Sequence, residues 1–322
     1  MNSNETRTEK RLRNRSENKT PALPAQVGME SLDTLWFQLS GTICNLSCSH
    51  CFISCSPQND KFKFLDRNSI RSFVAEGVKL GVKEFYFTGG EPFLNKEIYG
   101  ILEDTLSVGP VSVLTNGTVI RKRLAARLKA ISDATMYSLE LRVSLDGFDP
   151  SANDRLRGSG SFDSAIKGIK ALVDANFLPI ITAVKTWPDG EQQATLDSFK
   201  ALLGRLGYTR PRIKIIPALN LGEYRRQKDE PAEDQIVTEV MLRGYDVSQL
   251  LCSTSRLVTD QGVYVCPILL DSPDARLADS LPDSLRPYRL NHTACHTCYR
   301  HGAICSNFST AAIEKPRAAE QQ

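Results

Sequence analysis

Residues 35–51 read LWFQLSGTICNLSCSHC, a short apolar run followed at once by a loop that contains Cys44, Cys48 and Cys51. Short runs rich in apolar and β-branched residues are typical of buried strands. Similar runs recur along the chain at residues 84–88, 111–115, 141–145, 179–184 and 212–217. The cysteine loop therefore follows the first of several predicted strands.

Amphipathic stretches lie between these runs, with apolar residues three and four positions apart, and the clearest are residues 69–81, 121–132 and 162–177. Strands that alternate with helices predict a parallel sheet. We therefore expect an α/β fold, a partial (β/α)6 TIM-like barrel with a small cysteine-rich C-terminal domain. In such barrels the loops after the strands form the active site. Gly89-Gly90-Glu91-Pro92 follows the second predicted strand and Thr115-Asn116-Gly117 follows the third.

The predicted organisation has four parts. Residues 1–30 are polar and lack apolar periodicity, which predicts a disordered arm. We expect the barrel over residues 31–245, the cysteine-rich domain over 246–310 and a disordered tail over 311–322.

The composition excludes several classes of protein. The chain has 322 residues, 41% of them hydrophobic and 24% charged, and its formal net charge of +3 gives no basic surface for nucleic acid. The sequence contains no apolar run of membrane-spanning length and no secretory signal, so we expect a cytoplasmic protein with no membrane partner. Cysteines in a reducing compartment bind metal more often than they form disulfides.

The nine cysteines fall in two groups, four between Cys44 and Cys55 and five between Cys252 and Cys305. Two inorganic sites are therefore predicted. In the first group, Cys44, Cys48 and Cys51 offer three soft ligands in one loop, which suits an iron–sulfur cluster with one iron left open. A zinc site completed by His50 or Cys55 is the alternative.

The pattern C-x3-C-x2-C after a first strand, with GGEP after the second, resembles the radical S-adenosylmethionine superfamily. These enzymes use a [4Fe–4S] cluster to cleave S-adenosylmethionine into a 5′-deoxyadenosyl radical. The resemblance implies that the three cysteines hold the cluster and that an electron donor such as a flavodoxin or ferredoxin serves the enzyme. It also implies that the methionine amino group is bound by Gly89, Gly90 and Glu91.

Other cofactor contacts follow from the same resemblance. Members of the family often contact the ribose from the end of the fourth strand, which makes Ser144 and Asp146 candidates. The further cofactor-binding candidates are Asn116, after the third strand, and Arg157, in an Arg–Gly segment. His50 stands where the family usually has an aromatic residue, and we expect it to pack there. Cys55 lies outside the cysteine triad.

The second group reads Cys252-x9-Gly262-x3-Cys266 and then Cys295-x2-Cys298-x6-Cys305. It resembles the auxiliary-cluster domains called SPASM and twitch, although the spacing after Gly262 is one residue short and the SPASM set of seven cysteines is incomplete. One auxiliary [4Fe–4S] cluster is implied. Its ligands are either Cys252, Cys266, Cys295 and Cys298, or a set in which Cys305 replaces one of these. A zinc ribbon, with His292, His296 or His301 as possible ligands, is the alternative.

These features predict a radical enzyme that removes a hydrogen atom from a C–H bond. A thirty-residue arm is too short to fold as a peptide-leader-binding domain. We therefore expect a small natural-product or carbohydrate-like substrate that is epimerised or dehydrogenated. Maturation of a ribosomally made peptide is the alternative, and a non-catalytic iron–sulfur or zinc scaffold or redox sensor is the alternative of another class. In an epimerase, a spare thiol returns a hydrogen atom, and the candidates are Cys305, Cys252 and Cys55.

Overall fold

The computed structural model describes residues 23–226, 235–302 and 304–305. The strands are β1 (Gln26–Val27), β2 (Thr34–Gln38), β3 (Glu84–Thr88), β4 (Val111–Thr115), β5 (Leu139–Ser144), β6 (Ile180–Val184), β7 (Arg212–Ile216), β8 (Ser255–Thr259), β9 (Gly262–Tyr264), β10 (Arg276–Ala278) and β11 (Tyr288–Arg289). The α-helices are α2 (Arg67–Lys79), α3 (Ile98–Leu106), α4 (Lys122–Asp133), α5 (Pro150–Arg157), α6 (Ser161–Asp174), α7 (Gln192–Arg205), α8 (Gly222–Arg226), α9 (Glu239–Leu242), α10 (Leu281–Ser284) and α11 (Thr293–His301). Short 3₁₀ helices are η1 (Pro92–Leu94), η2 (Asp189–Glu191), η3 (Val247–Gln249), η4 (Leu251–Ser253) and η5 (Pro273–Ala275).

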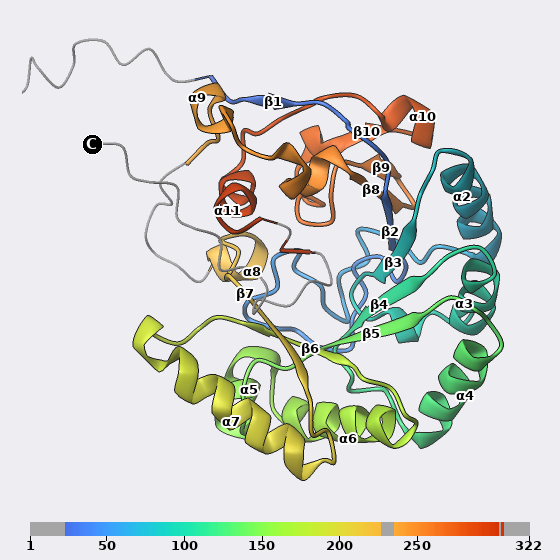
Figure 1. Cartoon of the computed structure of the whole chain (residues 1–322), viewed down its shortest axis with the longest axis vertical. Helices are drawn as coiled ribbons and strands as arrows, with labels where there is room; N and C mark the ends of the chain where they lie inside the picture. Colours follow the sequence, from blue (N-terminus) through green and yellow to red (C-terminus); the bar gives the residue numbers. More distant parts are fainter. Residues whose placement is uncertain (1–22, 227–234, 303, 306–322) are drawn as a thin grey trace, which may run out of the picture.

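A single curved sheet organises the molecule, with the strand order β10-β9-β8-β2-β3-β4-β5-β6-β7. Strands β2 to β7 run parallel in chain order. Figure 1 shows helices α2, α3, α4, α6 and α7 around the convex side of this sheet and the C-terminal elements on its concave side. The predicted partial (β/α)6 barrel is confirmed, and all of the predicted strands lie in it.

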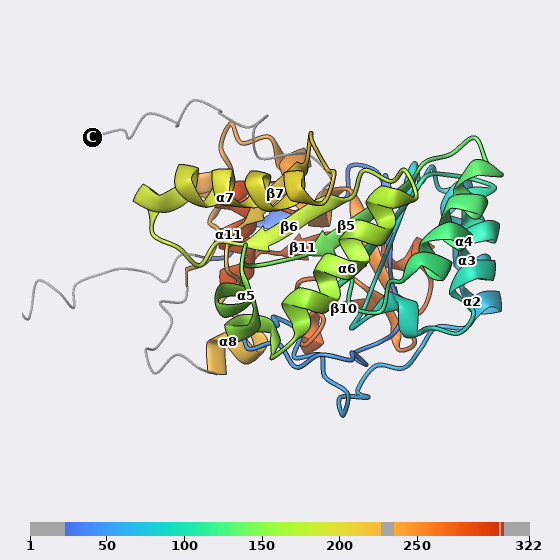
Figure 2. The same ribbon diagram turned by 90° about the horizontal axis from the view of Figure 1, so that it is seen from below.

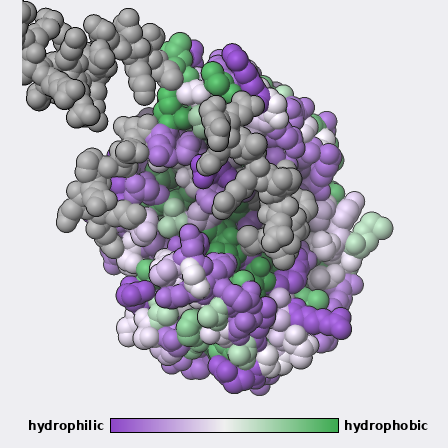
Figure 3. All heavy atoms as spheres, turned by 60° about the vertical axis from the view of Figure 1, so that its left-hand side comes forward, coloured by the Kyte–Doolittle hydropathy of each residue, from purple (hydrophilic) through white to green (hydrophobic). Residues whose placement is uncertain are grey.

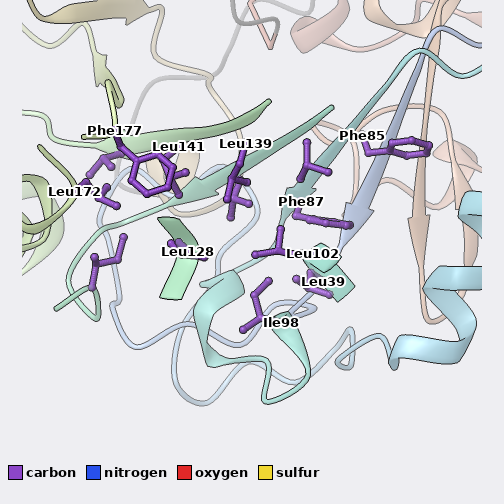
Figure 4. Packing of buried hydrophobic residues seen from close by; sticks show 14 of the residues in the cluster. Leu39, Phe85, Phe87, Ile98, Leu102, Leu128, Leu139, Leu141, Leu172 and Phe177 are labelled. Atoms are coloured by element: carbon purple, nitrogen blue, oxygen red, sulfur yellow. The ribbon is translucent and has the colours of Figure 1, made fainter. Parts of the chain in front are cut away.

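Alternate residues of each parallel strand face the helices, because side chains along a strand point to opposite faces. Phe85 and Phe87 of β3 and Leu139 and Leu141 of β5 are buried in one core with apolar residues of α3, α4 and α6. Figure 4 shows these rings and chains packed together between the sheet and the helices. Each fully buried side chain of this size contributes about 1.5–3 kcal/mol, so this layer holds the barrel together.

The opposite, inner face of the sheet is occupied near β2 and β3 by two stacked aromatic rings. Trp36 and Tyr86 have ring centroids 4.2 Å apart and pack in a second core with residues of the C-terminal region. The two faces of the sheet thus have separate cores, one for the helices and one for the cysteine-rich segment.

Helix α5 is fixed at both ends, which matters because it ends at Arg157. The Asp149 side chain accepts a hydrogen bond from the main-chain N of Ala152, and Pro150 begins the helix with a backbone angle suited to a first turn. Gly158 ends it with φ +98°, a conformation that L residues with a side chain rarely adopt. The position of Arg157 is therefore set by the local sequence.

The expected disordered arm over residues 1–30 differs from the structure in its last part, while residues 1–22 lie outside the described ranges. Ala25 is fully buried, and β1 pairs antiparallel with β11 through Gln26 with Arg289 and Val27 with Tyr288. Strand β1 is only two residues long, and its partner lies about 260 positions away. Local periodicity gives no sign of such a pairing.

The cysteine-rich C-terminal region continues the sheet of the barrel. Strand β8 pairs in parallel with β2, and β9 and β10 follow as antiparallel strands. The predicted tail over residues 311–322 lies outside the described ranges. Within those ranges, no helix combines the length and the apolar character needed to cross a membrane.

Candidate functional site

The loop that follows β2 carries Cys44, Cys48 and Cys51. The first residues of this cysteine loop are hydrogen-bonded to the loop that follows β3. The main-chain N atoms of Gly90 and Glu91 donate to the carbonyls of Gly41 and Ile43 at 3.0 and 3.1 Å. A Cβ on Gly90 would lie 2.1 Å from the Ile43 carbonyl oxygen.

Gly89 has the same kind of constraint. It adopts φ +142°, and a Cβ there would lie 2.4 Å from Ser40 Oγ. In this structure the glycine pair is therefore needed for the close approach of the cysteine loop itself. We expected the pair to make room for the cofactor, and that contact stays a prediction.

Glu91 is fully buried behind the cysteine loop. Its Oε1 accepts from Phe93 N at 3.1 Å and Thr115 Oγ1 at 2.8 Å, and its Oε2 accepts from Asn116 N at 2.8 Å. Burial raises the pKa of Glu91 to about 7, against the lowering effect of these hydrogen bonds. A carboxylate has about four lone-pair positions, so one position on Oε2 remains for another donor such as an ammonium group.

Asn116 links the loop after β4 to the cysteines. Its Nδ2 donates to Asn45 Oδ1 at 2.9 Å and lies 3.7 Å from Cys44 Sγ. Asn45 in turn donates to Thr118 Oγ1 at 2.8 Å. Thr118 Oγ1 donates back to Asn116 Oδ1 at 2.6 Å. The predicted candidate Asn116 is thus beside the first cysteine, in a closed network of two side-chain amides and one hydroxyl.

The end of β5 brings together Asp146, His50 and Arg157. Asp146 Oδ2 accepts from Arg157 Nε at 2.6 Å and lies 2.9 Å from His50 Nε2, while Oδ1 accepts from Val184 N at 2.7 Å. Burial disfavours the Asp146 carboxylate, but the Arg157 charge and the His50 hydrogen bond outweigh this and hold its pKa well below its usual range. Asp146 therefore orients two side chains of the site.

The group at the end of β5 lies against the cysteine loop. Ser49 N donates to the Leu156 carbonyl at 2.8 Å. Burial raises the pKa of the Cys48 thiol, and the positive charge of Arg157 acts in the opposite direction. Figure 2 shows the segment after β2 beside α5 and α8, and Glu223 N donates to the Cys51 carbonyl at 2.9 Å.

Two sequence predictions for this region need correction or remain open. His50 was expected to pack only, but its Nε2 also lies 2.9 Å from Asp146 Oδ2, and its Nδ1 is buried without a hydrogen-bond partner. Ser144 stays on β5, half-buried and paired in register with Thr182.

Cys55 is buried against the cysteine triad. Its main-chain N lies 3.2 Å from Cys51 Sγ. The Cys55 thiol also hydrogen-bonds to Cys51, which lowers the pKa of Cys51 to about 6 despite burial. In the same loop, burial raises the pKa of the Cys44 thiol to about 12.

The second cysteine group surrounds a small apolar cavity about 200 residues further along the chain. The cavity is lined by Cys252, Cys266, Cys295 and Cys298, together with apolar residues. Burial raises the pKa of all four, to about 11 for Cys252 and about 12 for Cys295. Four thiols are the number that a closed [4Fe–4S] cluster uses.

Arg256 supplies a positive charge beside this cavity. It is fully buried and donates to the main-chain carbonyls of Ser284, Cys252, Ser255 and Arg286. Among the described residues, no carboxylate forms an ion pair with Arg256. The nearby groups that favour its positive charge are Cys252 and Cys266. A buried guanidinium beside thiolates fits a centre with net negative charge.

Cys305 does not line the cavity, but it lies near Cys298, whose thiol pKa is raised first by burial and then by the charge of Cys305. Its carbonyl accepts from Arg142 Nη1 at 2.6 Å, and the positive charges of Arg142 and Lys214 oppose the effect of burial, which raises the pKa of its thiol. Cys305 therefore lies toward the inner face of β5 and β7. Among the described residues, no group of three or more histidine, cysteine or acidic side chains converges as a site for a single metal ion.

Comparison with known proteins defines the class of this chain. Residues 39–199 match the sequence model of the Radical SAM superfamily, and the chain belongs to that superfamily. It is a radical S-adenosylmethionine enzyme, with a [4Fe–4S] cluster and S-adenosylmethionine as cofactors. The donor set beside Cys44 fits them, because three thiols would leave one iron open next to an acceptor, Glu91, and a cation, Arg157.

Among curated relatives, the mycofactocin maturase MftC of Mycolicibacterium smegmatis is 34% identical over 169 residues, 52% of this chain and 40% of that protein. A probable GTP 3′,8-cyclase of Methanosarcina mazei is 32% identical over 145 residues, 42% of this chain and 41% of that protein. The chain thus spans less than half the length of these two relatives.

Solved structures share the fold. Streptococcus suis SuiB bound to precursor peptide SuiA superposes with a TM-score of 0.59 at 17% identity, covering 79% of this chain and 64% of that one. Native anSMEcpe with bound AdoMet and Kp18Cys peptide gives 0.59 at 16% identity, covering 82% and 81%.

The sequence analysis missed several residues of the site. The His50–Asp146 pair joins residues far apart in the chain, and nothing local announces it. Arg142 and Lys214 had a visible signal, because each is a charged residue inside an otherwise apolar predicted strand. Arg256 lies in β8, which was not among the predicted strands, so it had no such signal.

Proposed function

We propose that this radical S-adenosylmethionine enzyme modifies a peptide substrate. The observation that carries the proposal is the 34% identity to the mycofactocin maturase over 169 residues, 52% of this chain. The presence of a second cysteine cavity in the same chain also supports it. This reverses the sequence-based preference for a small-molecule substrate, which relied on the short N-terminal arm.

In this proposal Cys44, Cys48 and Cys51 hold the radical cluster. When bound, the cluster and S-adenosylmethionine supply a 5′-deoxyadenosyl radical. Glu91 binds the methionine ammonium with its remaining lone pair, and Arg157 places a positive charge beside Cys48 for the methionine carboxylate. Asp146 and His50 act as positioning residues, because their contacts are to Arg157 and to each other.

We also propose that the cavity-lining set of Cys252, Cys266, Cys295 and Cys298 holds one auxiliary [4Fe–4S] cluster. The buried charge of Arg256 supports a negatively charged occupant of this site. This assignment keeps the predicted division into a barrel over residues 31–245 and a cluster-binding segment over 246–310, even though both share one sheet.

Figure 3 supports access for a substrate with apolar groups. It shows apolar surface at the centre of the face that comes forward from the left-hand side of Figure 1, bordered by hydrophilic residues. An apolar surface of this kind suits the side chains of a peptide.

The test uses protein reconstituted anaerobically with iron and sulfide, then supplied with S-adenosylmethionine and dithionite. Synthetic peptides encoded beside the gene are one arm, and GTP and simple sugars are the others. The proposal predicts a mass change in a peptide together with release of 5′-deoxyadenosine. The opposite result is turnover of GTP or a sugar with the peptides unchanged, which would restore a small-molecule function. The matched negative control is the variant with Cys44, Cys48 and Cys51 changed to Ala.

Epimerisation is the second candidate reaction, favoured by the position of Cys305. Cys252 lines the cavity and Cys55 contacts Cys51, which leaves Cys305 as the thiol nearest the inner face of β5 and β7. In deuterated water an epimerase places one deuterium in its product, and Cys305→Ser stops product formation while 5′-deoxyadenosine is still released. A product without deuterium from the wild-type enzyme rejects this reaction.

A further inference from the structure

Three polar residues share the inner face of the last strands of the barrel. Thr182 of β6 is the register partner of Lys214 of β7, and Arg142 of β5 pairs with Ile180, two positions before Thr182. Their neighbours Leu141, Ile181 and Ala183 face the helices and are buried in the core. Because side chains alternate along a strand, Arg142, Thr182 and Lys214 point into the barrel.

Arg142 is only 4% exposed. Its Nη1 donates to the Cys305 carbonyl, but its Nε is buried without a hydrogen-bond partner, and so is Thr182 Oγ1. Two buried donors at diagonal positions of neighbouring strands are thus unsatisfied. Since a buried polar group without a partner is costly, such a pair is expected where a ligand completes it.

Arg142 has a cationic neighbour, Lys214, whose pKa its charge lowers. The nearby groups that favour its own charge are Cys305 and Tyr86, and no carboxylate among the described residues forms an ion pair with it. Glu140, on the same face of β5, is bound to Arg212 Nη1 at 2.5 Å. Burial together with the Arg142 charge lowers the pKa of Lys214 to about 7. Lys214 therefore supplies a second positive charge when it is protonated, and a bound anion would favour that form.

Two cations in a low-dielectric interior repel each other and favour an anion between or beside them. The Nε edge of a guanidinium offers two parallel N–H groups, a geometry that matches the two oxygens of a carboxylate. The contact that Arg142 already makes is to a peptide carbonyl, that of Cys305.

We propose that Arg142, Lys214 and Thr182 form an anion subsite inside the barrel that binds a carboxylate of the substrate. The proposal rests on the proposed function in one respect, since it takes the carboxylate to be a peptide's C-terminus or acidic side chain. The carboxylate of S-adenosylmethionine is the other possible source. Arg157 lies beside Cys48, whereas Arg142 lies deeper in the barrel, two residues before the end of β5, and this favours the substrate.

The experiment measures binding by calorimetry to the reconstituted holoenzyme with S-adenosylmethionine present. The probes are a set of N-acetylated tripeptides with free C-terminal carboxylates, the same tripeptides as amides, and lactate as a non-peptide carboxylate. We expect the acids to bind roughly tenfold or more tightly than the amides, since a charge-assisted hydrogen bond is lost in the amide.

Arg142→Gln and Lys214→Met should each abolish this preference, while Arg142→Lys should keep part of it. The control variants Arg205→Gln and Lys200→Met each remove a positive charge from the exposed face of α7. They should leave the preference for acids over amides unchanged. Iron content and the affinity for S-adenosylmethionine should stay at wild-type values in every variant, which also shows that the variants fold.

Several results would overturn the subsite. These are equal binding of acids and amides by the wild type, a preference that survives both Arg142→Gln and Lys214→Met, and loss of S-adenosylmethionine affinity in place of tripeptide affinity. If lactate binds in an Arg142-dependent way and no tripeptide binds, the anion subsite stands and the peptide function fails.

Discussion

The two cysteine regions of this protein differ in what surrounds their thiols. The loop after β2 offers Cys44, Cys48 and Cys51 beside polar groups that reach it from β3, β4 and α5, among them Glu91. The C-terminal cavity encloses its thiols in apolar walls, with one buried cation, Arg256, alongside.

This difference indicates different roles. Three thiols among hydrogen-bonding groups leave a coordination position open and supply partners for the amino and carboxylate groups of a cofactor. Four thiols in an apolar pocket would complete a cluster and leave no position for a further ligand. We therefore expect chemistry at the first region and electron storage or transfer at the second, and the following changes test that division.

The largest effect should come from changing Cys44, Cys48 and Cys51 together to Ala. This removes the ligands of the open site, so release of 5′-deoxyadenosine should stop and about half of the bound iron should remain, because two similar clusters share it. Iron analysis and chromatography of the nucleoside measure both. Cys55→Ala is the matched control and should keep both properties. Continued cofactor cleavage by the triple variant would place the radical site elsewhere.

Changing Cys295 and Cys298 to Ala should remove the second cluster while some uncoupled cofactor cleavage continues. The iron content should fall by about half, since only the closed site loses its ligands. Cys305→Ala is the control, because Cys305 does not line the cavity, and it should keep its iron. Full iron content in the double variant would contradict the auxiliary site. Iron loss in Cys305→Ala would instead show that Cys305 is one of the ligands of the auxiliary cluster.

Glu91→Ala should weaken S-adenosylmethionine binding by roughly ten- to a hundredfold without loss of iron, because a charge-assisted hydrogen bond is removed. Glu103→Gln, an exposed change on α3, is the control.

The same residue should make binding depend on pH. The pKa of Glu91 is raised to about 7 by burial, so its carboxylate gains a proton as the pH falls through that value and can no longer pair with an ammonium. Affinity in the wild type should therefore decrease below pH 7, and this dependence should be absent in Glu91→Ala. A wild-type affinity that is constant between pH 6 and 8 would remove Glu91 from the cofactor site.

Arg256→Met should lower the reduction potential of the auxiliary cluster by roughly 40–90 mV, because loss of a nearby positive charge worth about 1–2 kcal/mol disfavours the more negative, reduced state. Potentiometric titration followed by electron paramagnetic resonance measures this shift. Arg256→Lys keeps the charge and should shift the potential less. Equal potentials in the wild type and Arg256→Met would show that the charge acts on something else.

The sequence was sufficient for the barrel but not for the contacts that close it. Strands such as residues 84–88 have strong apolar character, and their parallel neighbours follow in chain order, so local pattern and topology agree. Strand β1 has two residues and pairs with β11, and β8 joins β2 from the far end of the chain. Pairings at such separation have no local signature.

The site shows the same limit. The cysteine spacing and the GGEP motif are local and were readable as a resemblance. The structural reason for Gly90, the close approach of the Ile43 carbonyl, became visible only in three dimensions. The His50–Asp146 contact was missed for the same reason, whereas Arg142 and Lys214 were readable as charges within apolar strands.

The most direct test of the central claim is electron paramagnetic resonance of the dithionite-reduced protein with and without S-adenosylmethionine. The account predicts two cluster signals. The signal that disappears in the Cys44, Cys48 and Cys51 variant should change shape when S-adenosylmethionine binds to the wild type. The signal that disappears in the Cys295 and Cys298 variant should keep its shape. A change confined to the C-terminal signal, or no change in either, would contradict the assignment of an open and a closed site.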